Sequence, residues 1–556
     1  MPPIRLLPLA LAALCHSAGA QQVPGAGAQL QQIPPSPTAP QRAAPQISIQ
    51  ATPGASNSVT GDATVLVQHL HISGALAYSE ADLVASTGFR PGAKLSLADL
   101  RAMAARIVAR YRDGGYFLAQ AYLPPQEIKD GAVTIAVLEG RYGVVDVRNQ
   151  ARLSDALVRG ELSGLAGGSA ITLAPLESRL LRLSDIPGVA ISSTLVPGAE
   201  PGTSDLVVLV EPGPRLTGSV DADNAGNRYT GTYRLGATLN VNNPAGHGDR
   251  ATVRVLTSGS GLNYARASYQ TRLNRATVGA AYSGLHYELG REFENLQASG
   301  TAGIASVYAS TPLLRSRQAS LWAQVDLDAK TFRDRVDAAA TVVDRRAHVL
   351  TTTLRGDRAD ALGLGGSTTF RVAVSLGRIL IDTASVRAQD AATARTHGAF
   401  EKLAFNLARE QWVSDSVSLH AAVSGQLASK NLDVSEKMEL GGIDGVRAYP
   451  EGEAYGDAGW LLGIEARWRL PAREPSRTGQ LQLVAFLDAG SVSMNESPWA
   501  SGDNRRTLSG AGVGLNWAGY HDLVVRAAYA HGLGNETASS APDRRGRLWV
   551  QAVKYF

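Results

Sequence analysis

The stretch "WLLGIEARWRL" (residues 460–470) alternates between apolar and polar side chains. Its even-numbered positions are all apolar, namely Trp460, Leu462, Ile464, Ala466, Trp468 and Leu470. The opposite face carries three charged residues, Glu465, Arg467 and Arg469. Because successive side chains of a strand point to opposite faces, the stretch predicts a strand with one apolar and one charged face. Such a strand suits a transmembrane barrel, which has lipid outside and a polar lumen inside.

The same alternation continues to the end of the chain. Alternating runs such as "DLVVRAAYAHG" (522–532) are separated by clusters of Gly, Asn, Asp and Ser. All seven tryptophans lie in this part, as expected if some of them form the aromatic girdles of a barrel. A strand with its turn would take about 21 residues, enough for transmembrane strands of about 9–11 residues. We therefore predict a transmembrane β-barrel of about 16 antiparallel strands over residues 214–556. A soluble β-sandwich is the alternative, in which the charged faces would lie in water.

Ahead of the barrel, one pattern of a strand, two helices and two strands occurs twice. The clearest helix lies in "SLADLRAMAARIVARYRDGG" (96–115), where Ser96 and Asp99 have the spacing of a capping box. Its apolar stripe consists of Leu100, Met103, Ile107 and Tyr111. The sequence thus predicts two small α/β modules, a first module over residues 63–140 and a second module over residues 141–213.

The N-terminal segment has the features of a secretory signal peptide. Arg5 precedes an apolar run, "LLPLALAAL", and the small residues "AGA" follow. We expect residues 1–20 to be removed, together with Cys15, the only cysteine. Residues 21–62 are rich in Gln, Pro, Ala and Ser, which predicts a tether. The sequence leaves open whether "GAQLQQ" (27–32) forms a plug helix within it. After the signal peptide, no stretch is long and apolar enough for a membrane helix.

Charge and motifs exclude several classes of function. The formal net charge of +4 is nearly balanced over 556 residues, which indicates no nucleic-acid partner. The sequence has no P-loop and no His-Glu-x-x-His motif. His69 and His71 share one face of a predicted strand, but they lack a third ligand nearby. We expect no cofactor, no metal site and no enzymatic activity; a barrel hydrolase is the enzymatic alternative.

Several stretches, in their order along the chain, resemble motifs of one family. "YRDGGYFLAQAYLPPQEIKDGAVTIAVLEG" (111–140) resembles its first periplasmic domain, and "DNAGNRYTGTYR" (223–234) with "NNPAGHGD" (242–249) resemble its first barrel strand and hairpin. "VRAY" resembles a Val-Arg-Gly-Tyr/Phe motif on a loop that folds back into the lumen. "GIEAR" (463–467) and "FLDAG" (486–490) are similar to the wall motifs that receive this loop. The family is TpsB, the two-partner secretion transporters or haemolysin secretion/activation proteins, whose modules are POTRA domains.

The resemblance implies a site inside the barrel. The lumenal loop, around residues 441–458, would present Val446, Arg447, Ala448 and Tyr449, with Ala448 at a position where the family prefers glycine. The wall motifs would supply Glu465, Asp488, Phe486, Gly490 and Gly463.

Alternation places two of these wall residues, Asp488 and Glu465, on the lumenal side. An arginine fork suits a carboxylate better than a lysine would. We therefore expect Arg447 to pair with Asp488, with Glu465 nearby as a second carboxylate. The alternative is a solvated loop arginine beside Glu451 and Glu453.

The resemblance also implies a function, the outer-membrane pore of a two-partner (type Vb) secretion system with its modules in the periplasm. The expected partners are outer-membrane lipid and a secreted TpsA-type exoprotein, a large β-helical adhesin or haemolysin that would cross a monomeric barrel without ATP. A segment of it could add as a strand to the second module. Candidate residues for this contact are Val189, Ile191, Leu195, Leu206, Val208 and Val210. The alternative function is the assembly of other barrels into the membrane; a passive porin would not need the modules.

Overall fold

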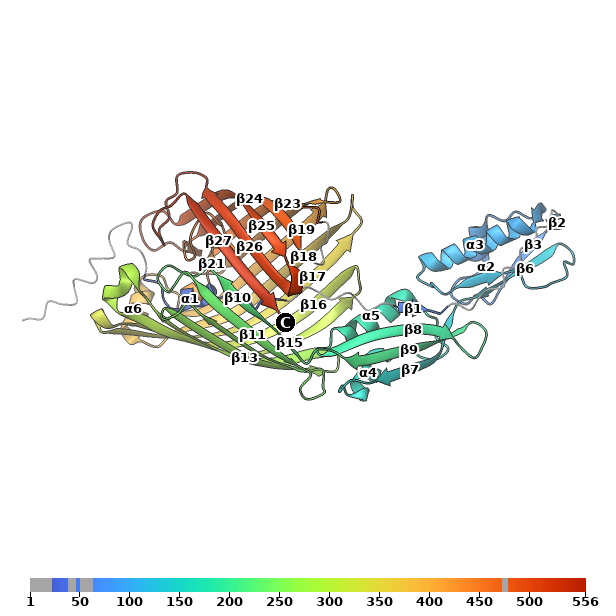
Figure 1. The fold of residues 1–556 in the computed structure, drawn as a ribbon, viewed down its shortest axis with the longest axis horizontal. Helices are drawn as coiled ribbons and strands as arrows, with labels where there is room; N and C mark the ends of the chain where they lie inside the picture. Colours follow the sequence, from blue (N-terminus) through green and yellow to red (C-terminus); the bar gives the residue numbers. More distant parts are fainter. Residues whose placement is uncertain (1–22, 39–46, 51–63, 473–478) are drawn as a thin grey trace, which may run out of the picture.

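The computed structural model describes residues 23–38, 47–50, 64–472 and 479–556. The expected signal peptide and Cys15 lie outside the described residues. Two α/β modules extend from one end of a large barrel (Figure 1), which we call the module end, and the opposite end is the far end. Among the described residues, no helix has both the length and the apolar character needed to cross a membrane.

The barrel is one closed sheet of sixteen strands, as predicted. In barrel order the strands are β10 (Leu216–Asp223), β11 (Arg234–Asn242), β12 (Arg250–Thr257), β13 (Leu262–Leu273), β14 (Ala276–Glu288), β15 (Ala298–Arg315), β16 (Ala319–Val336), β17 (Thr341–Asp360), β18 (Gly366–Ile381), β19 (Gly398–Trp412), β20 (Val417–Ala428), β23 (Ala458–Arg469), β24 (Gln480–Ser493), β25 (Arg505–Ala518), β26 (Leu523–Gly532) and β27 (Gly546–Tyr555). All neighbours pair antiparallel, and β10 pairs with β27 to close the cylinder.

The two faces of the barrel wall have the polarity that the alternation predicts. Trp460, Ile464 and Trp468 are exposed on the outer face, whereas Glu465 and Arg467 of the same strand face the lumen. Strand length differs from the expectation, because β10 has 8 residues and β17 has 20. The longest strands, β15 to β17, extend past the shorter ones at the far end (Figure 1), where the exposed Arg333 and Arg335 of β16 carry charge.

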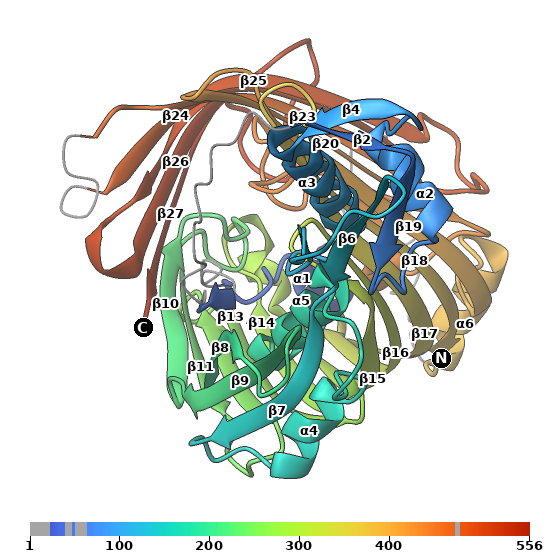
Figure 2. The ribbon, with the colours of Figure 1, turned by 90° about the vertical axis from the view of Figure 1, so that its right-hand side faces the viewer.

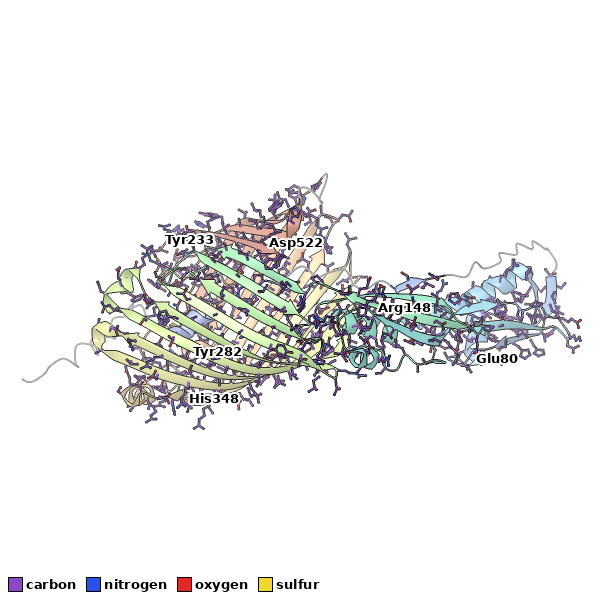
Figure 3. All side chains as sticks on the ribbon, turned by 60° about the horizontal axis from the view of Figure 1, so that its bottom comes forward. Glu80, Arg148, Tyr233, Tyr282, His348 and Asp522 are labelled. Carbon is purple, nitrogen blue, oxygen red and sulfur yellow. The ribbon has the colours of Figure 1, made fainter. Side chains whose placement is uncertain are left out.

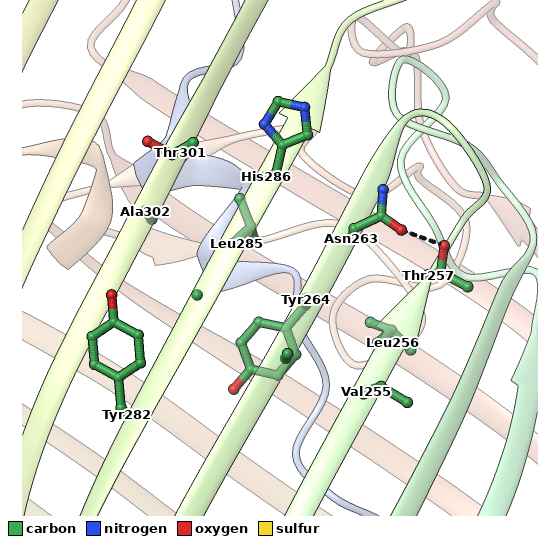
Figure 4. Close-up of a pocket in the computed structure, with 12 residues that line it drawn as sticks. Val255, Leu256, Thr257, Asn263, Tyr264, Tyr282, Leu285, His286, Thr301 and Ala302 are labelled. Atoms are coloured by element: carbon green, nitrogen blue, oxygen red, sulfur yellow. Dashed lines mark hydrogen bonds between the residues drawn. The ribbon is translucent and has the colours of Figure 1, made fainter.

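One wall of the barrel shows both environments side by side. On the outer face of β12 to β15, small residues leave a depression of about 540 Å³, bordered by Tyr282 (Figures 3 and 4). On the inner face of the same strands, Leu256 and Leu285 are buried and pack in one cluster with Ala26. The strands therefore present an apolar surface outward and enclose a packed segment inside.

That packed segment is α1 (Ala26–Gln31), a short helix from the predicted tether that lies inside the barrel (Figure 1). The Ala26 amide donates to the Asp334 carboxylate over 2.7 Å, and the Thr230 hydroxyl donates to Gln29 over 2.9 Å. The Gln31 side chain donates to the Val434 carbonyl over 2.7 Å. The helix thus contacts the wall and the loop between β20 and β23, and it fills part of the lumen.

The first module consists of β2 (Thr64–Val67), β3 (His69–Ser73), α2 (Glu80–Thr87), β4 (Ala93–Ser96), α3 (Leu97–Asp113), β5 (Gln120–Tyr122) and β6 (Ala132–Leu138). The predicted capping box is confirmed, since the Ser96 side chain accepts from the Asp99 amide and Asp99 accepts from the Ser96 amide. All four residues of the predicted stripe are buried against the sheet.

Glu139 holds the first module together in a way that the sequence did not indicate. Its buried carboxylate accepts from the amides of Leu76 and Ala77, each over 2.6 Å, and from the Tyr111 hydroxyl over 2.9 Å. Burial would raise the pKa of this carboxyl, but these hydrogen bonds and Arg141 hold the pKa below its usual value. The carboxylate therefore ties a loop to α3 and to the start of the second module.

We expect Glu139→Ala to destabilise the first module by about 3 kcal/mol, because it leaves the buried Tyr111 hydroxyl and the part-buried amides of Leu76 and Ala77 without an acceptor. Hydrogen exchange of the first module in the full chain measures this loss, and Glu139→Gln should lose less. Since the folded pKa is depressed, the stabilisation is present above the unfolded pKa and is lost as pH falls through the folded pKa. Unchanged exchange in Glu139→Ala would contradict the assignment.

The second module consists of β7 (Arg141–Asn149), α4 (Asp155–Leu162), α5 (Leu173–Ser184), β8 (Val189–Pro197) and β9 (Thr203–Pro212). Its sheet has the order β1-β8-β9-β7, in which β1 (Ile47–Ile49) comes from the predicted tether. β1 runs parallel to β8, with Ile47 opposite Ser193 and Ile49 opposite Leu195. The tether thus contributes one element to the lumen and one to the second module.

The remaining elements lie between strands. They are α6 (Ala384–Ala392), the short strands β21 (Met438–Glu439) and β22 (Tyr455–Gly456), and the 3₁₀ helices η2 (Arg291–Leu296), η3 (Asp337–Ala339), η4 (Val434–Glu436) and η5 (Tyr520–Asp522). β21 pairs with β22 within the long segment between β20 and β23. The lumenal loop predicted around residues 441–458 lies almost entirely in this segment, and the name is used below for all of residues 429–457.

Candidate functional site

The tip of the lumenal loop is packed against the inner face of the barrel wall. Val446, Ala448 and Tyr449 are buried in one cluster with Val484 and Phe486 of β24. The cluster also contains Leu440, Ala454, Val492, Leu508 and Ala530. The loop therefore lies inside the barrel, where the resemblance implied it.

Arg447 contacts both predicted carboxylates. Its Nε and Nη2 donate to the two Asp488 oxygens over 2.8 and 2.7 Å, and its Nη1 donates to Glu465 over 2.7 Å. The Arg447 backbone amide also donates to Asp488 over 3.1 Å. The planar fork thus bridges two neighbouring strands, β23 and β24. The single nitrogen of a lysine could not reproduce this arrangement of three side-chain bonds from separate nitrogens.

The third wall residue, Phe486, lies flat against this arginine. The Arg447 guanidinium carbon is 3.5 Å from the centre of the Phe486 ring, within the range of a cation–π contact. Asp488 has only 3% of its side chain exposed, whereas Arg447 has 15%. The aromatic ring and the bidentate carboxylate together fix the guanidinium at one position.

Glycines of the wall make room for the loop and for this ring. Gly463 lies opposite Asp488 in the β23–β24 register, and a Cβ on Gly490 would collide with Leu440 of the loop. On β25, a Cβ on Gly510 would come within 2.6 Å of the Ala448 methyl, and one on Gly512 would enter the Phe486 ring. Ala448 is thus accommodated by Gly510. The glycines of "GAGVG" (510–514) are typical of close packing in a strand, but the sequence did not indicate that the loop and the Phe486 ring are what they accommodate.

Two further contacts hold the loop tip. The Trp549 indole of β27 donates to the Arg447 carbonyl over 2.6 Å, and the Tyr449 hydroxyl donates to the Glu536 carbonyl over 3.0 Å. Trp549 therefore faces the lumen and not the lipid. The sequence predicted only that some of the tryptophans form aromatic girdles, and nothing in it indicated this partner of Trp549.

The base of the lumenal loop is anchored to the opposite wall by ion pairs that the sequence did not reveal. Glu436 accepts from Lys330 of β16 over 2.6 Å and from Lys402 of β19 over 2.9 Å. Asp433 accepts from Arg345 of β17 over 2.6 Å. All five groups are largely buried. With Arg447 on one wall and Glu436 on the other, the loop spans the lumen.

The candidate client-binding residues of the second module are mostly in its core. Val189, Leu195, Leu206, Val208 and Val210 are buried, and Ile191 packs against the same cluster. β9 lies between β8 and β7 and has no free edge. The predicted client contact is therefore limited to the backbone edge of β8, with which β1 pairs in this structure. The buried side chains themselves are not available to contact a client.

The second module is fixed to the module end of the barrel by charged contacts. Arg315 of β15 donates to both Asp185 oxygens over 2.8 and 2.9 Å, and Arg317 pairs with Glu177 over 2.8 Å. The Ser154 amide donates to the Gly246 carbonyl over 2.9 Å. The module therefore contacts several turns and strand ends on the β11–β16 side of the barrel, among them the end of β13, where Arg272 pairs with Glu161.

Reversing one charge at this contact should loosen the module. We expect Arg315→Asp to broaden the distance distribution between spin labels at R148C and L362C. The substitution replaces a bidentate ion pair with repulsion between two carboxylates, and the coupling energy of such a pair is about 2 kcal/mol. Adding Asp185→Arg should narrow the distribution again. If the distribution in the double variant is as broad as in Arg315→Asp alone, the Arg315–Asp185 pair does not fix the second module against the barrel.

Together, the closed sixteen-stranded barrel, the returning loop with its arginine and the two α/β modules define a transmembrane β-barrel with a lumenal loop and α/β modules at one end. The sequence model of the family described as "Haemolysin secretion/activation protein ShlB/FhaC/HecB" matches residues 202–517, and that of the "POTRA domain, ShlB-type" matches residues 65–140. The chain belongs to this family of two-partner secretion transporters.

Individual relatives agree with this placement. The Heme/hemopexin transporter protein HuxB of Haemophilus influenzae is 29% identical over 84% of this chain and 82% of its own length. The Outer membrane transporter CdiB of Escherichia coli is 24% identical over 93% of this chain and 86% of its own. A solved structure of CdiB from Escherichia coli superposes with a TM-score of 0.70 and 21% identity, over 91% of this chain and 93% of that one. The protein is an outer-membrane transporter with its POTRA modules in the periplasm, so the module end faces the periplasm and the far end the outside.

Proposed function

We propose that the protein exports a large β-helical exoprotein of the adhesin or haemolysin class from the periplasm through its lumen to the cell surface. The observation that carries the proposal is the obstructed lumen, which contains α1 and the Arg447 loop, both held by hydrogen bonds to the wall. A passive pore has no use for two removable obstructions. A channel that must open for one partner and remain closed otherwise does.

Recognition of the partner is assigned to the β8 edge of the second module. β1 demonstrates that this edge accepts an extended parallel strand, with the Gln50 amide donating to the Leu195 carbonyl over 2.9 Å. An exoprotein segment could pair in the same way, since main-chain hydrogen bonds give affinity without a fixed sequence. The module holds this edge close to the barrel entrance through Arg315 and Asp185.

Transport is proposed to proceed without ATP. A β-helical client buries its core by stacking one repeat on the next, so that folding propagates from neighbour to neighbour. Repeats that fold at the cell surface cannot return through the lumen, and this biases movement outward. Arg447 would release Asp488 and Glu465 as the loop shifts.

The test is co-expression with a candidate exoprotein, a large secreted repeat protein from the same genome, followed by measurement of that exoprotein in the medium. The proposal expects it in the medium only when the transporter is present, and its retention in the periplasm would overturn the proposal. Depletion of the transporter separates the alternative function, because an assembly factor would deplete many unrelated barrels from the outer membrane. The proposal expects those barrels at normal levels.

A further inference from the structure

A cavity of about 580 Å³ lies in the lumen between the Arg447 loop and the periplasmic mouth. Its wall is formed by the periplasmic halves of β23 to β27, and its roof by Ile443, Asp444 and Arg447 of the loop. Viewed from the module side (Figure 2), the second module lies in front of the β11–β16 side, and β24, β26 and β27 lie beside it. The cavity is therefore on the side of the mouth to which the module is not bound.

The lining of this cavity is rich in guanidinium and amide groups. Five arginines face only two carboxylates there; the arginines are Arg234, Arg447, Arg467, Arg469 and Arg526, and the carboxylates are Asp444 and Glu465. Four side-chain amides complete the polar lining, namely Gln480, Gln482, Asn516 and Gln551. Arg234, Arg447 and Arg467 are paired with carboxylates of the barrel, so the exposed positive charge of the cavity lies on Arg469 and Arg526, beside groups that both donate and accept hydrogen bonds.

Two of these arginines, Arg469 and Arg526, form no salt bridge in the described part of the chain, and the Asp444 carboxylate is a charged neighbour of Arg526. Arg234, Arg447 and Arg467 are held by carboxylates of the barrel. Within the part of the chain that the structure describes, Arg526 has no hydrogen bond or salt bridge from its side chain. In the same described residues, the Arg469 side chain contacts only the Trp412 ring, whose centre lies 4.6 Å from the guanidinium carbon. Both side chains are exposed in the lumen.

We infer that this cavity binds an acidic, extended segment of the exported polypeptide on its way to the loop. The guanidinium groups of Arg469 and Arg526 would each donate two hydrogen bonds to a client carboxylate. Gln480 already donates to the Leu470 carbonyl and Asn516 to the Gln482 oxygen. The Gln482 nitrogen, the Asn516 oxygen and the Gln551 amide are the donors and acceptors that an extended peptide backbone could use. The inference rests on the proposed function and adds a substrate preference to it.

The chemistry of the lining favours a peptide over other anions. A phosphate-rich ligand would need several convergent cations, whereas here the two free guanidiniums are separated by amide side chains on β24 and β25. A chain of alternating carboxylates and small residues therefore fits the lining.

The experiment uses the full chain in detergent and three fluorescein-labelled decapeptides, of alternating Glu and Ser, Gln and Ser, or Lys and Ser. We expect fluorescence anisotropy to detect binding of the Glu peptide, with affinity at least about tenfold above that of the other two at low salt. The double variant Arg469→Gln/Arg526→Gln should lose this preference. The variant Arg469→Lys/Arg526→Lys should keep part of it, because it retains the charge but not the fork.

Arg333→Gln is the matched control, since Arg333 lies on the outer face at the far end and should not affect binding. Heat-modifiable mobility in gels checks that each variant is a folded barrel. Equal binding of all three peptides, or an unchanged preference in the folded double variant, would overturn the inference. If the Glu peptide shows no preferred binding while the wild type still exports its exoprotein, only this inference is wrong. If the exoprotein does not reach the medium, the proposed function is wrong.

Discussion

Arg447→Ala is expected to reduce export of the exoprotein at least tenfold while leaving a folded barrel in the membrane. The substitution removes three side-chain hydrogen bonds and leaves Asp488, which is 3% exposed, without its cation. Removing one partner of a buried ion pair costs about 3–5 kcal/mol. Since about 1.4 kcal/mol changes an equilibrium tenfold, the loop would no longer be held at the wall.

The matched variant is Arg447→Lys, which keeps the charge but cannot bridge Asp488 and Glu465 with one planar fork. We expect it to export at an intermediate level. The measurement is exoprotein in the medium, with heat-modifiable mobility of the barrel as the control for folding. Wild-type export by a folded Arg447→Ala barrel would remove the loop arginine from the mechanism.

The second large effect is expected from fixing α1 in the lumen. A Cβ built on Gly27 lies 3.0 Å from the Ser435 Cβ, slightly closer than the roughly 3.5–4.5 Å of a disulfide. The variant Gly27→Cys/Ser435→Cys should therefore form a disulfide after a small shift. The only natural cysteine, Cys15, lies in the predicted signal peptide. If α1 must leave the lumen, the oxidised variant should export at least about tenfold less than the reduced one.

The control for this variant is the same protein after reduction with dithiothreitol, which separates the covalent lock from any steric effect of the new side chains. Each single cysteine variant should export normally. Equal export by the oxidised and reduced double variant would mean that the client passes with α1 in place.

The barrel could be predicted from the sequence because lipid and lumen impose opposite polarity on alternate residues. In "WLLGIEARWRL", the strand period alone placed Glu465 in the lumen and Trp468 outside. Strand length could not be predicted in this way, since residues beyond the hydrocarbon are free of that constraint. For this reason β17 is nearly twice as long as expected.

The candidate site was predicted in part. Parity placed Asp488 and Glu465, and the resemblance supplied Arg447, which the structure brings within 2.7 Å of both carboxylates. The helix α1 remained undecided and the strand β1 was not predicted, because such short elements are stabilised by tertiary contacts and not by their own propensity. Pairs such as Lys330 with Glu436 were missed because they join residues 106 positions apart. For β8 and β9, apolar alternation could not distinguish an edge strand from a central one.

The central claim is that the client passes through the lumen of this barrel. The most direct test places a photo-crosslinking amino acid at Gln551, which lines the lumenal cavity, or at its neighbour Val550, which is exposed on the outer face. A client stalled by a folded C-terminal fusion should crosslink at position 551 and not at position 550. Crosslinking at position 550 alone would contradict the account, because the client would then travel along the lipid face.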